Sequence, residues 1–314
     1  MEISIEESVI RTLAYFDIFD YPLTFSEIKK YCETAIKITD DTLKDIIYSI
    51  PIIQESDSFF YFLGRSEIVA KRIERNDISI SKIGKAKVIA KILSKIPTIE
   101  FIGVSGSLSM NNSLHSDDID LFFITRKNTM WTTRFFVNLT LILLGQKRAK
   151  HEKSAKDKIC PNMFIEKGKL TLPKKRVSLY LAHEVVQLKT LFDKNNTHSE
   201  FLSENKWIHK FLPNIELPVF KKKREAKNSV FNFPLFPVEA LFFSLQKLYM
   251  RNVVTSEIIL SKLAMFHPVN KEKIILDLYD LKSDKYSSLF EDNRWVDTDE
   301  ARFYFDDKKN RILN

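Results

Sequence analysis

The sequence predicts an α+β fold in which a central mixed sheet is flanked by helical segments at both ends of the chain. Helical apolar stripes with capping residues recur over the first 50 residues, and extended apolar runs alternate with helix-prone segments between residues 98 and 175. Helical periodicity dominates again from residue 176 to residue 314. A length of 314 residues is sufficient for two or three domains.

Composition narrows the class of protein. With 44% hydrophobic and 29% charged residues, the chain is typical of a folded, soluble protein. It opens without a basic stretch followed by an apolar run, so we expect a cytoplasmic protein with no membrane partner. The most apolar window, from Phe135 to Leu144, is about half the length of a bilayer span, and we expect a core helix there. Cys32 and Cys160 lack the spacing of a disulfide framework or a zinc site, so we expect both to be buried as small hydrophobes.

Residues 1–64 predict a winged-helix-like module, because three helices are followed by a hairpin. The helices are expected over residues 5–17, from residue 25, and over residues 42–50. Thr24 and Glu27 have the spacing of a capping box, and Asp40 or Asp41 can cap the third helix. Residues 52–64 form two extended runs around a turn at residues 55–58.

DNA binding by this module is doubtful. Its third helix, the one that would enter a major groove, carries Asp40, Asp41 and Asp45 against a single Lys44. Phosphates would repel this helix. A net charge of +8 spread over the chain adds little weight to a nucleic-acid partner. We therefore expect the module to pack on protein.

Three further regions follow the module. Residues 65–97 predict a helical connector that is interrupted near Gly84 and ends before Pro97. Residues 98–175 predict the mixed sheet, with extended segments at 98–105 and 119–125, a strand pair at 159–166 and 169–172, and helices at 108–111 and 128–145. Residues 176–314 predict a mainly helical C-terminal domain with helices in 178–192, 201–212, 238–265 and 271–281, and an exposed linker at 221–227.

Two aspartates at the start of a buried strand require an explanation. An ionised carboxylate without a partner costs several kcal/mol when it leaves water. Asp118 and Asp120 lie on one face of the expected strand, roughly 6 to 7 Å apart along the backbone. Two carboxylates in this arrangement can hold a divalent cation, and Mg²⁺ (or Mn²⁺) fits oxygen ligands that leave room for phosphate. Gly106 and Ser107, at the end of the preceding strand, allow a phosphate to approach the backbone.

These residues carry a resemblance to a known family. Gly106-Ser107, ten intervening residues and then Asp118-Ile119-Asp120 resemble the Gly-Ser/Asp-x-Asp signature of the DNA polymerase β-like nucleotidyltransferase superfamily, with the spacing of its minimal nucleotidyltransferase branch. The segments FDIFDYPLTFSEI and KICPNMFIE are similar to a group of prokaryotic nucleotidyltransferase-domain proteins. The resemblance implies that residues 98–175 form a nucleotidyltransferase core that moves an NMP from an NTP to an acceptor hydroxyl and releases pyrophosphate. It implies metal-binding and catalytic roles for Asp118 and Asp120, and triphosphate binding by Gly106 and Ser107.

The resemblance also implies a third carboxylate on a later strand, and here the sequence departs from the family pattern. Asn162 occupies the middle of the segment ICPNMFIE and Glu166 its end, so each is a candidate for the third site position. An amide can bind a metal but cannot take a proton. Arg126, after the second strand, can contact a triphosphate or simply remain solvated.

Other polar residues near the motif are expected to be structural. Asp117 is expected to be a loop residue or helix cap, and His115 a solvated loop histidine. His183 is followed by glutamate but has no HExxH partner, which favours a core role.

Two classes of function follow from the sequence. The first is a metal-dependent nucleotidyltransferase whose acceptor is an RNA, a protein or a small molecule. The second is a catalytically weak or inactive relative that acts as a nucleotide- or nucleic-acid-binding regulatory module. The completeness of the acidic cluster separates them, because only the enzyme requires a base and a fully coordinated cation.

Overall fold

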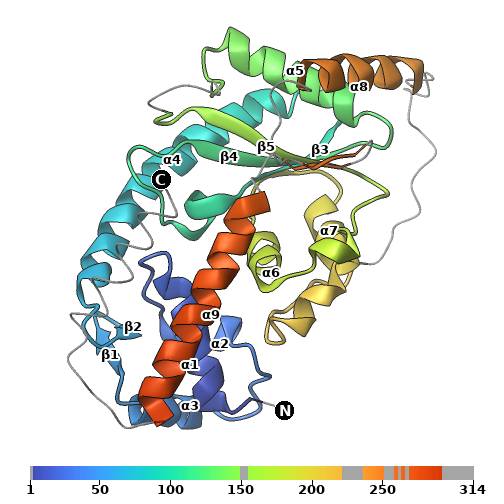
Figure 1. The fold of residues 1–314 in the computed structure, drawn as a ribbon. Coiled ribbons are helices and arrows are strands. Elements are labelled where there is room, and N and C mark those ends of the chain that lie inside the picture. The colour runs from blue at the N-terminus through green and yellow to red at the C-terminus, as the bar shows by residue number, and fades with distance from the viewer. Residues whose placement is uncertain are drawn as a thin grey trace.

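The fold is mixed α+β and is built around a six-stranded sheet (Figure 1). The computed structural model describes residues 3–148, 155–220, 236–250, 258–260, 263–265 and 269–291. The strand order is β6-β3-β4-β5-β8-β7, and β4 and β5 are parallel while the other neighbours are antiparallel. The strands are β3 (Ile99–Val104), β4 (Ile119–Thr125), β5 (Ile159–Glu166), β6 (Lys189–Asp193), β7 (Ile258–Leu260) and β8 (Leu263–Met265).

The N-terminal residues form the expected three helices and hairpin: α1 (Ile5–Asp17), α2 (Phe25–Tyr31), α3 (Asp40–Ser49), β1 (Ile53–Ser56) and β2 (Phe59–Phe62). The capping box of Thr24 and Glu27 is present. Thr39 rather than an aspartate caps α3, since its side chain accepts a hydrogen bond from the Thr42 amide. Asp57 and Ser58 both have positive φ, the backbone that a tight hairpin requires. The elements are those of a winged helix, and the assignment of the module to that fold stays a prediction.

The expected connector is one uninterrupted helix, α4 (Glu67–Leu93), which passes through Gly84 without a break. Glycine inside a helix costs only about 1 kcal/mol relative to alanine. The helix α4 packs on the sheet and on the hairpin of β1 and β2, and this packing outweighs that cost. The predicted interruption is therefore wrong.

The segments after residue 176 differ most from expectation. The end of the expected helix 178–192 is strand β6, which follows α6 (Leu179–Val186) and pairs with β3. Residues 258–265, expected within a helix, contribute β7 and β8 beyond α8 (Phe236–Met250). Residues 169–172 form no strand, and β5 pairs instead with β4 and β8. Because three strands of the sheet come from this region, it is not a separate, mainly helical domain; the predicted linker 221–227 lies outside the described residues.

Two hydrophobic cores lie on opposite faces of the sheet. One face, with Phe122 and Ile165, packs on α6, on α7 (Thr197–Glu204) and on the N-terminal module. The other face, with Phe123 and Phe164 in stacked contact, packs on the end of α4 and on α5 (Met130–Leu143). The structure also contains short 3-10 helices at Gly106–Met110, Lys174–Arg176 and Lys206–Lys210. Figure 1 shows α5 and α8 above the sheet and α6 and α7 below it.

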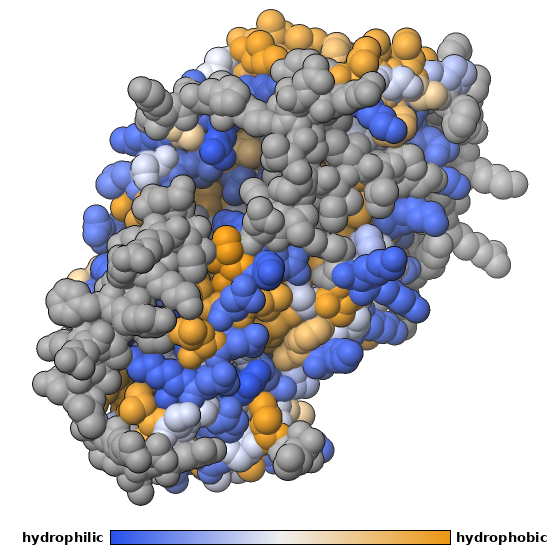
Figure 2. All heavy atoms as spheres, viewed as in Figure 1, coloured by the Kyte–Doolittle hydropathy of each residue, from blue (hydrophilic) through white to orange (hydrophobic). Residues whose placement is uncertain are grey.

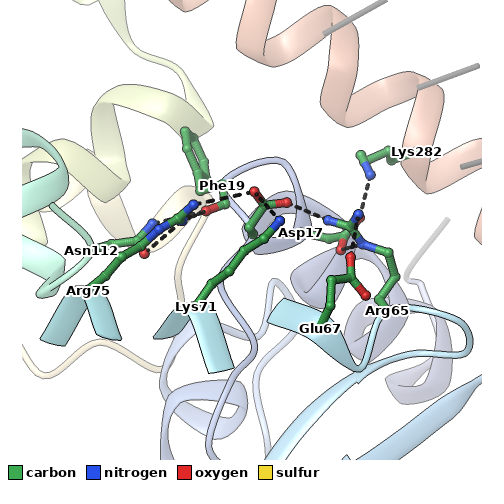
Figure 3. Close-up of polar contacts among 9 residues, drawn as sticks. Asp17, Phe19, Arg65, Glu67, Lys71, Arg75, Asn112 and Lys282 are labelled. Carbon is green, nitrogen blue, oxygen red and sulfur yellow. Dashed lines mark hydrogen bonds and ion pairs between the residues drawn. The ribbon is translucent and has the colours of Figure 1, made fainter. Parts of the chain in front are cut away.

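The last described helix, α9 (Val269–Glu291), lies along α1 (Figure 1) and closes the N-terminal module. Buried charged side chains join α9, the end of α1 and the turn before α4. Asp17 accepts hydrogen bonds from Arg65 and from Lys282 of α9, and Arg65 also bonds Asp20 at 2.6 Å (Figure 3). The module is thus fixed to the rest of the chain by both apolar and ionic contacts.

The helix expected in the core is only half buried. Met130, Trp131 and Val137 of α5 face the sheet, whereas an outer row of α5 and α8 is exposed, and Figure 2 shows apolar side chains there, at the top of the molecule: Phe135, Phe136, Leu139, Ile142, Leu143, Leu241, Leu245 and Leu248. Among the described residues, no helix is long and apolar enough to cross a membrane.

His183 lies in the core, as the sequence favours. It is 2% exposed and stacks on Tyr15 at 4.1 Å. Its Nδ1 lies 3.2 Å from Nε2 of the Gln187 side chain. Burial lowers the pKa of His183 to about 3, and the charge of Lys30 adds to this effect.

This depressed pKa predicts a loss of stability in mild acid. Below about pH 6.5 the unfolded chain binds a proton at His183 and the folded chain does not, so the unfolding free energy falls by up to about 1.4 kcal/mol per pH unit. We expect His183→Gln to remove this part of the slope between pH 7 and pH 5 in urea titrations, whereas His115→Gln, at an exposed site, keeps it. An unchanged slope in His183→Gln would show that this histidine is protonated in the fold.

Candidate functional site

The two aspartates of the motif lie where the sequence predicts, at the start of the central strand β4. Asp118 precedes the strand and Asp120 is its second residue. The Ile119 amide between them donates to the Lys158 carbonyl, which fixes this end of β4 against β5. Asp118 has a cationic partner, because its Oδ2 accepts a hydrogen bond from Arg148 Nη1 at 2.7 Å. Arg148 therefore offsets part of the free-energy cost of removing the paired carboxylates from water.

Cys160 completes a cluster with the aspartates. It is the register partner of Asp120 on the parallel strand β5. One ligand atom each of Asp118, Asp120 and Cys160 lies within 4.8 Å of the other two. Burial raises the pKa of the Cys160 thiol well above its usual value, and the charges of Asp120 and Asp118 act in the same direction while Arg148 opposes them. Without a cation the thiol therefore keeps its proton.

Gly106 lies against this cluster and has a backbone that favours glycine. Its φ is +66°, and a Cβ at this position would lie 3.2 Å from Asp120 Oδ2. Ser105, immediately before it, donates its amide hydrogen to the Asp120 carbonyl at 3.1 Å. Ser105 is 6% exposed, and within the described part of the chain its hydroxyl has no hydrogen-bond partner. The open backbone and the unsatisfied hydroxyl both lie beside Asp120.

The loop between the two halves of the motif is internally bonded through Asp117. Its Oδ2 accepts hydrogen bonds from the Leu114 amide at 2.8 Å and from the hydroxyls of Ser107 and Ser113. Asp117 is thus a loop residue rather than a third member of the cluster, and His115 is exposed. Ser107, expected to bind a triphosphate, lies beside the cluster with its hydroxyl directed to the loop.

The N-terminal module and α4 hold the same loop in place. Asn112 bonds the Phe19 carbonyl at 3.0 Å and Arg75 at 3.2 Å, as Figure 3 shows. Tyr21 donates to the Met110 carbonyl at 3.0 Å. Lys189 of β6 bonds Asn111. The module therefore packs on the loop of the site.

Lys82 of α4 anchors the final turn of the loop. Its ammonium group is buried and bonds the Asp117 carbonyl at 2.6 Å, the Asp157 carboxylate at 2.7 Å and the His115 carbonyl at 3.3 Å. Burial alone would raise the pKa of Asp157, but the hydrogen bond and charge of Lys82 outweigh it and lower this pKa. Lys82 therefore joins α4 to the loop before the aspartates and to the turn before β5.

We expect Lys82→Met to destabilise the protein and to weaken metal binding, because the loop loses two contacts and Asp157 loses a third. A loss of about 1–3 kcal/mol in unfolding free energy is expected from the charged hydrogen bonds, measured by urea unfolding. Lys87→Met, at an exposed position of the same helix, is the matched control and should change little. Equal stabilities of the two variants would contradict the anchoring role.

Arg126, predicted to contact a triphosphate, lies at the opposite end of β4. It is six residues beyond Asp120, which at about 3.3 Å per residue is about 20 Å away along the strand. Its guanidinium bonds the Pro97 carbonyl at 3.5 Å and is 3.8 Å from Glu100. Arg126 therefore supports the far end of the sheet and does not belong to the cluster.

The two candidates for the third site position are displaced by a bulge in β5. Leu121 pairs with Pro161 and Phe122 with Met163, so Asn162 is the extra residue between them. Beyond the bulge Glu166 pairs with Thr125, five residues past Asp120 and about 16 Å along the strand. Glu166 is too distant to share a cation with the aspartates. Asn162 is buried at the bulge, and Cys160 faces Asp120 in its place.

Sequence reasoning missed Cys160, Arg148 and Lys82. Cys160 has no neighbouring cysteine or histidine in the sequence, which favours a buried hydrophobe, but in the structure it is only partly buried and lies beside the aspartates. The signal that could have identified it is Pro161, since proline cannot donate to a sheet ladder and marks an irregularity in a central strand. Lys82 could have been noticed as a lysine in the buried helical row that also contains Ser79, Ala86 and Ile89.

Comparisons of the chain with protein-family models, with curated proteins and with solved structures find no match.

Proposed function

We propose that the protein is a metal-dependent nucleotidyltransferase that moves an NMP from an NTP to an acceptor hydroxyl. The observation that carries this proposal is the juxtaposition of Asp118, Asp120 and the Gly106 backbone at the meeting point of β3, β4 and β5. Two carboxylates on one strand offer anionic ligands to a cation, and the adjacent backbone without a Cβ leaves space for a phosphate.

The residues present fit a bound divalent cation. Asp118 and Asp120 each supply a carboxylate oxygen, and Cys160 adds a third donor within 4.8 Å. A cation at this position would neutralise charge on the triphosphate and on the departing pyrophosphate. The chain's own contribution is to hold Asp118 through Arg148, to keep the Gly106 backbone open beside Asp120, and to anchor the intervening loop through Lys82.

One observation favours the second candidate, a nucleotide-binding module with weak or no turnover. Among the described residues, the cluster contains no third carboxylate, and a group that could accept the proton of an acceptor hydroxyl is therefore lacking at that position. Burial raises the pKa of the Cys160 thiol, so it keeps its own proton and is not available to accept another. Binding without rapid transfer is the outcome that this arrangement would give.

The test is incubation of the purified chain with each α-labelled NTP, Mg²⁺ or Mn²⁺, and cell extract. A labelled RNA, protein or small molecule that depends on added metal supports transfer and identifies the acceptor class and the base together. ATP binding that depends on metal, with no labelled product from any NTP, would favour the binding module. If the chain shows no metal-dependent binding and no labelled product, both candidate functions are contradicted.

A further inference from the structure

We propose that Cys160 is the third ligand of the Asp118–Asp120 site, which therefore takes a borderline-soft divalent ion of the Zn²⁺ type in preference to Mg²⁺. This inference rests on the proposed function only in placing a cation at the aspartates. It departs from the expectation of Mg²⁺ (or Mn²⁺), which rests on oxygen ligands alone. Thiolates favour Zn²⁺ and similar ions, whereas sites for Mg²⁺ are built from oxygen ligands.

The register of the sheet makes the thiol part of the site. Ser105, Asp120 and Cys160 are neighbours across β3, β4 and β5: Ser105 bonds the Asp120 backbone, and Asp120 pairs with Cys160. In-register neighbours point to the same face of a sheet. The bulge at Pro161 and Asn162 begins directly after Cys160, so the register that aligns the thiol with Asp120 is interrupted only beyond it.

The distances suit a single ion. Ligand atoms that bind one Zn²⁺ at about 2.0–2.3 Å in tetrahedral geometry lie about 3.5 Å apart. The three donor atoms already lie within 4.8 Å of one another. Side-chain rotations that move these atoms by about an ångström would bring them to the spacing that one ion requires. Three protein ligands with an open fourth position are the arrangement of catalytic zinc sites.

The charges of the surrounding residues also fit. Two carboxylates and one thiolate carry three negative charges, and a divalent ion together with Arg148 carries three positive charges. Arg148 bonds one oxygen of Asp118, which leaves that carboxylate a second oxygen for an ion. On binding, the thiol proton passes to solvent, because a coordinated thiol is deprotonated.

An independent observation marks the open position. The Ser105 hydroxyl is buried without a partner in the described chain, directly after β3 and next to Asp120. Alternation along β3 places Ser105 on the same face as Phe101, whose ring contacts Phe122, and Phe122 shares the face of Asp120. A water or phosphate oxygen in the fourth position of the ion would satisfy this hydroxyl.

Co²⁺ is the probe for thiolate ligation, because a cobalt–thiolate bond gives an intense near-ultraviolet charge-transfer band. We expect the full chain, reduced with a phosphine, to develop this band up to one equivalent of Co²⁺ and to lose it on addition of Zn²⁺. The chain has two cysteines, so the matched pair Cys160→Ser and Cys32→Ser assigns the band completely. Cys160→Ser should lose the band and bind Zn²⁺ at least about tenfold more weakly. Cys32→Ser, in the N-terminal core beside Ser8, should keep both properties.

A second variant guards against misfolding of the serine variant. Cys160→Asp supplies a hard ligand at the same place and should shift the preference from Zn²⁺ toward Mg²⁺ or Mn²⁺ by about tenfold or more, measured by competition calorimetry. A wild-type protein that binds Co²⁺ through the aspartates without the thiolate band would overturn the role of Cys160 and leave the proposed function standing. A thiolate band that persists in both Asp118→Asn and Asp120→Asn would overturn the shared site. A different result would contradict the proposed function itself. In that case metal-dependent NTP binding would be unchanged in both aspartate variants.

Discussion

Replacing Asp118 or Asp120 with asparagine is expected to weaken metal-dependent NTP binding by about 100-fold or more and to remove any transfer activity. Loss of a group that only supports a metal ligand typically costs 10- to 100-fold in affinity, and these two residues are proposed as the ligands themselves. Calorimetry with ATP in the presence of Mg²⁺, Mn²⁺ or Zn²⁺ measures the effect. Asp45→Asn, the same change at an exposed site on α3, is the control and should bind as the parent does.

The two aspartate variants should differ in stability when metal is chelated. Asp120 faces the Asp118 charge, so Asp120→Asn relieves repulsion and should melt at or slightly above the parent. Asp118→Asn removes the carboxylate that Arg148 bonds at 2.7 Å and gains no such benefit. If both variants keep metal-dependent ATP binding at the parent's affinity, the assignment of the site to these carboxylates is wrong.

The elements that the sequence predicts well are those with local signals. Residues 119–125 form β4 as expected, because a continuous apolar run follows a polar loop. The capping box of Thr24 and Glu27 begins α2 as expected. Here short-range hydrogen bonding and periodicity decide the structure, so one sequence is sufficient.

The errors fall where distant pairing decides. Residues 189–193 continue an apolar helical pattern, yet they form β6 because the open edge of β3 pairs with them. The segment 258–265 becomes two strands because β5 offers its second edge to β8. Neither edge can be seen in the local sequence. For the same reason, the sequence does not show that strands after residue 175 join the central sheet.

At the candidate site the sequence located two aspartates and a glycine but not their partners. Regular alternation along β5 predicts that Asn162 and Glu166 share a face, and the bulge changes which residue faces Asp120. Arg148 follows a helix and a turn, and its contact with Asp118 spans thirty positions of sequence. Strand register and such distant contacts depend on tertiary packing, which a single sequence does not specify.

The largest effect on stability is expected from Asp17→Asn, with a loss of about 3–5 kcal/mol in unfolding free energy. The Asp17 side chain is 3% exposed and is bonded by Arg65 at 3.0 Å and by Lys282. These residues come from the end of α1, the turn before α4 and the middle of α9, so one carboxylate holds three segments together (Figure 3). Removing its charge takes from Lys282, which is also buried, a carboxylate that it bonds.

The pH dependence of this loss provides its decisive check. Burial by itself would raise the pKa of Asp17, but the charges and hydrogen bonds of Lys282 and Arg65 outweigh it and lower this pKa. A carboxylate with a depressed folded pKa stabilises the fold above its unfolded value of about 3.9, and this contribution is lost as the pH falls through the folded pKa. The difference between parent and Asp17→Asn in urea unfolding should therefore stay constant from pH 8 to pH 5. A difference that shrinks within this range, or that is below about 1 kcal/mol at pH 7 as for an exposed ion pair, would show that Asp17 does not hold the segments together as a buried anion.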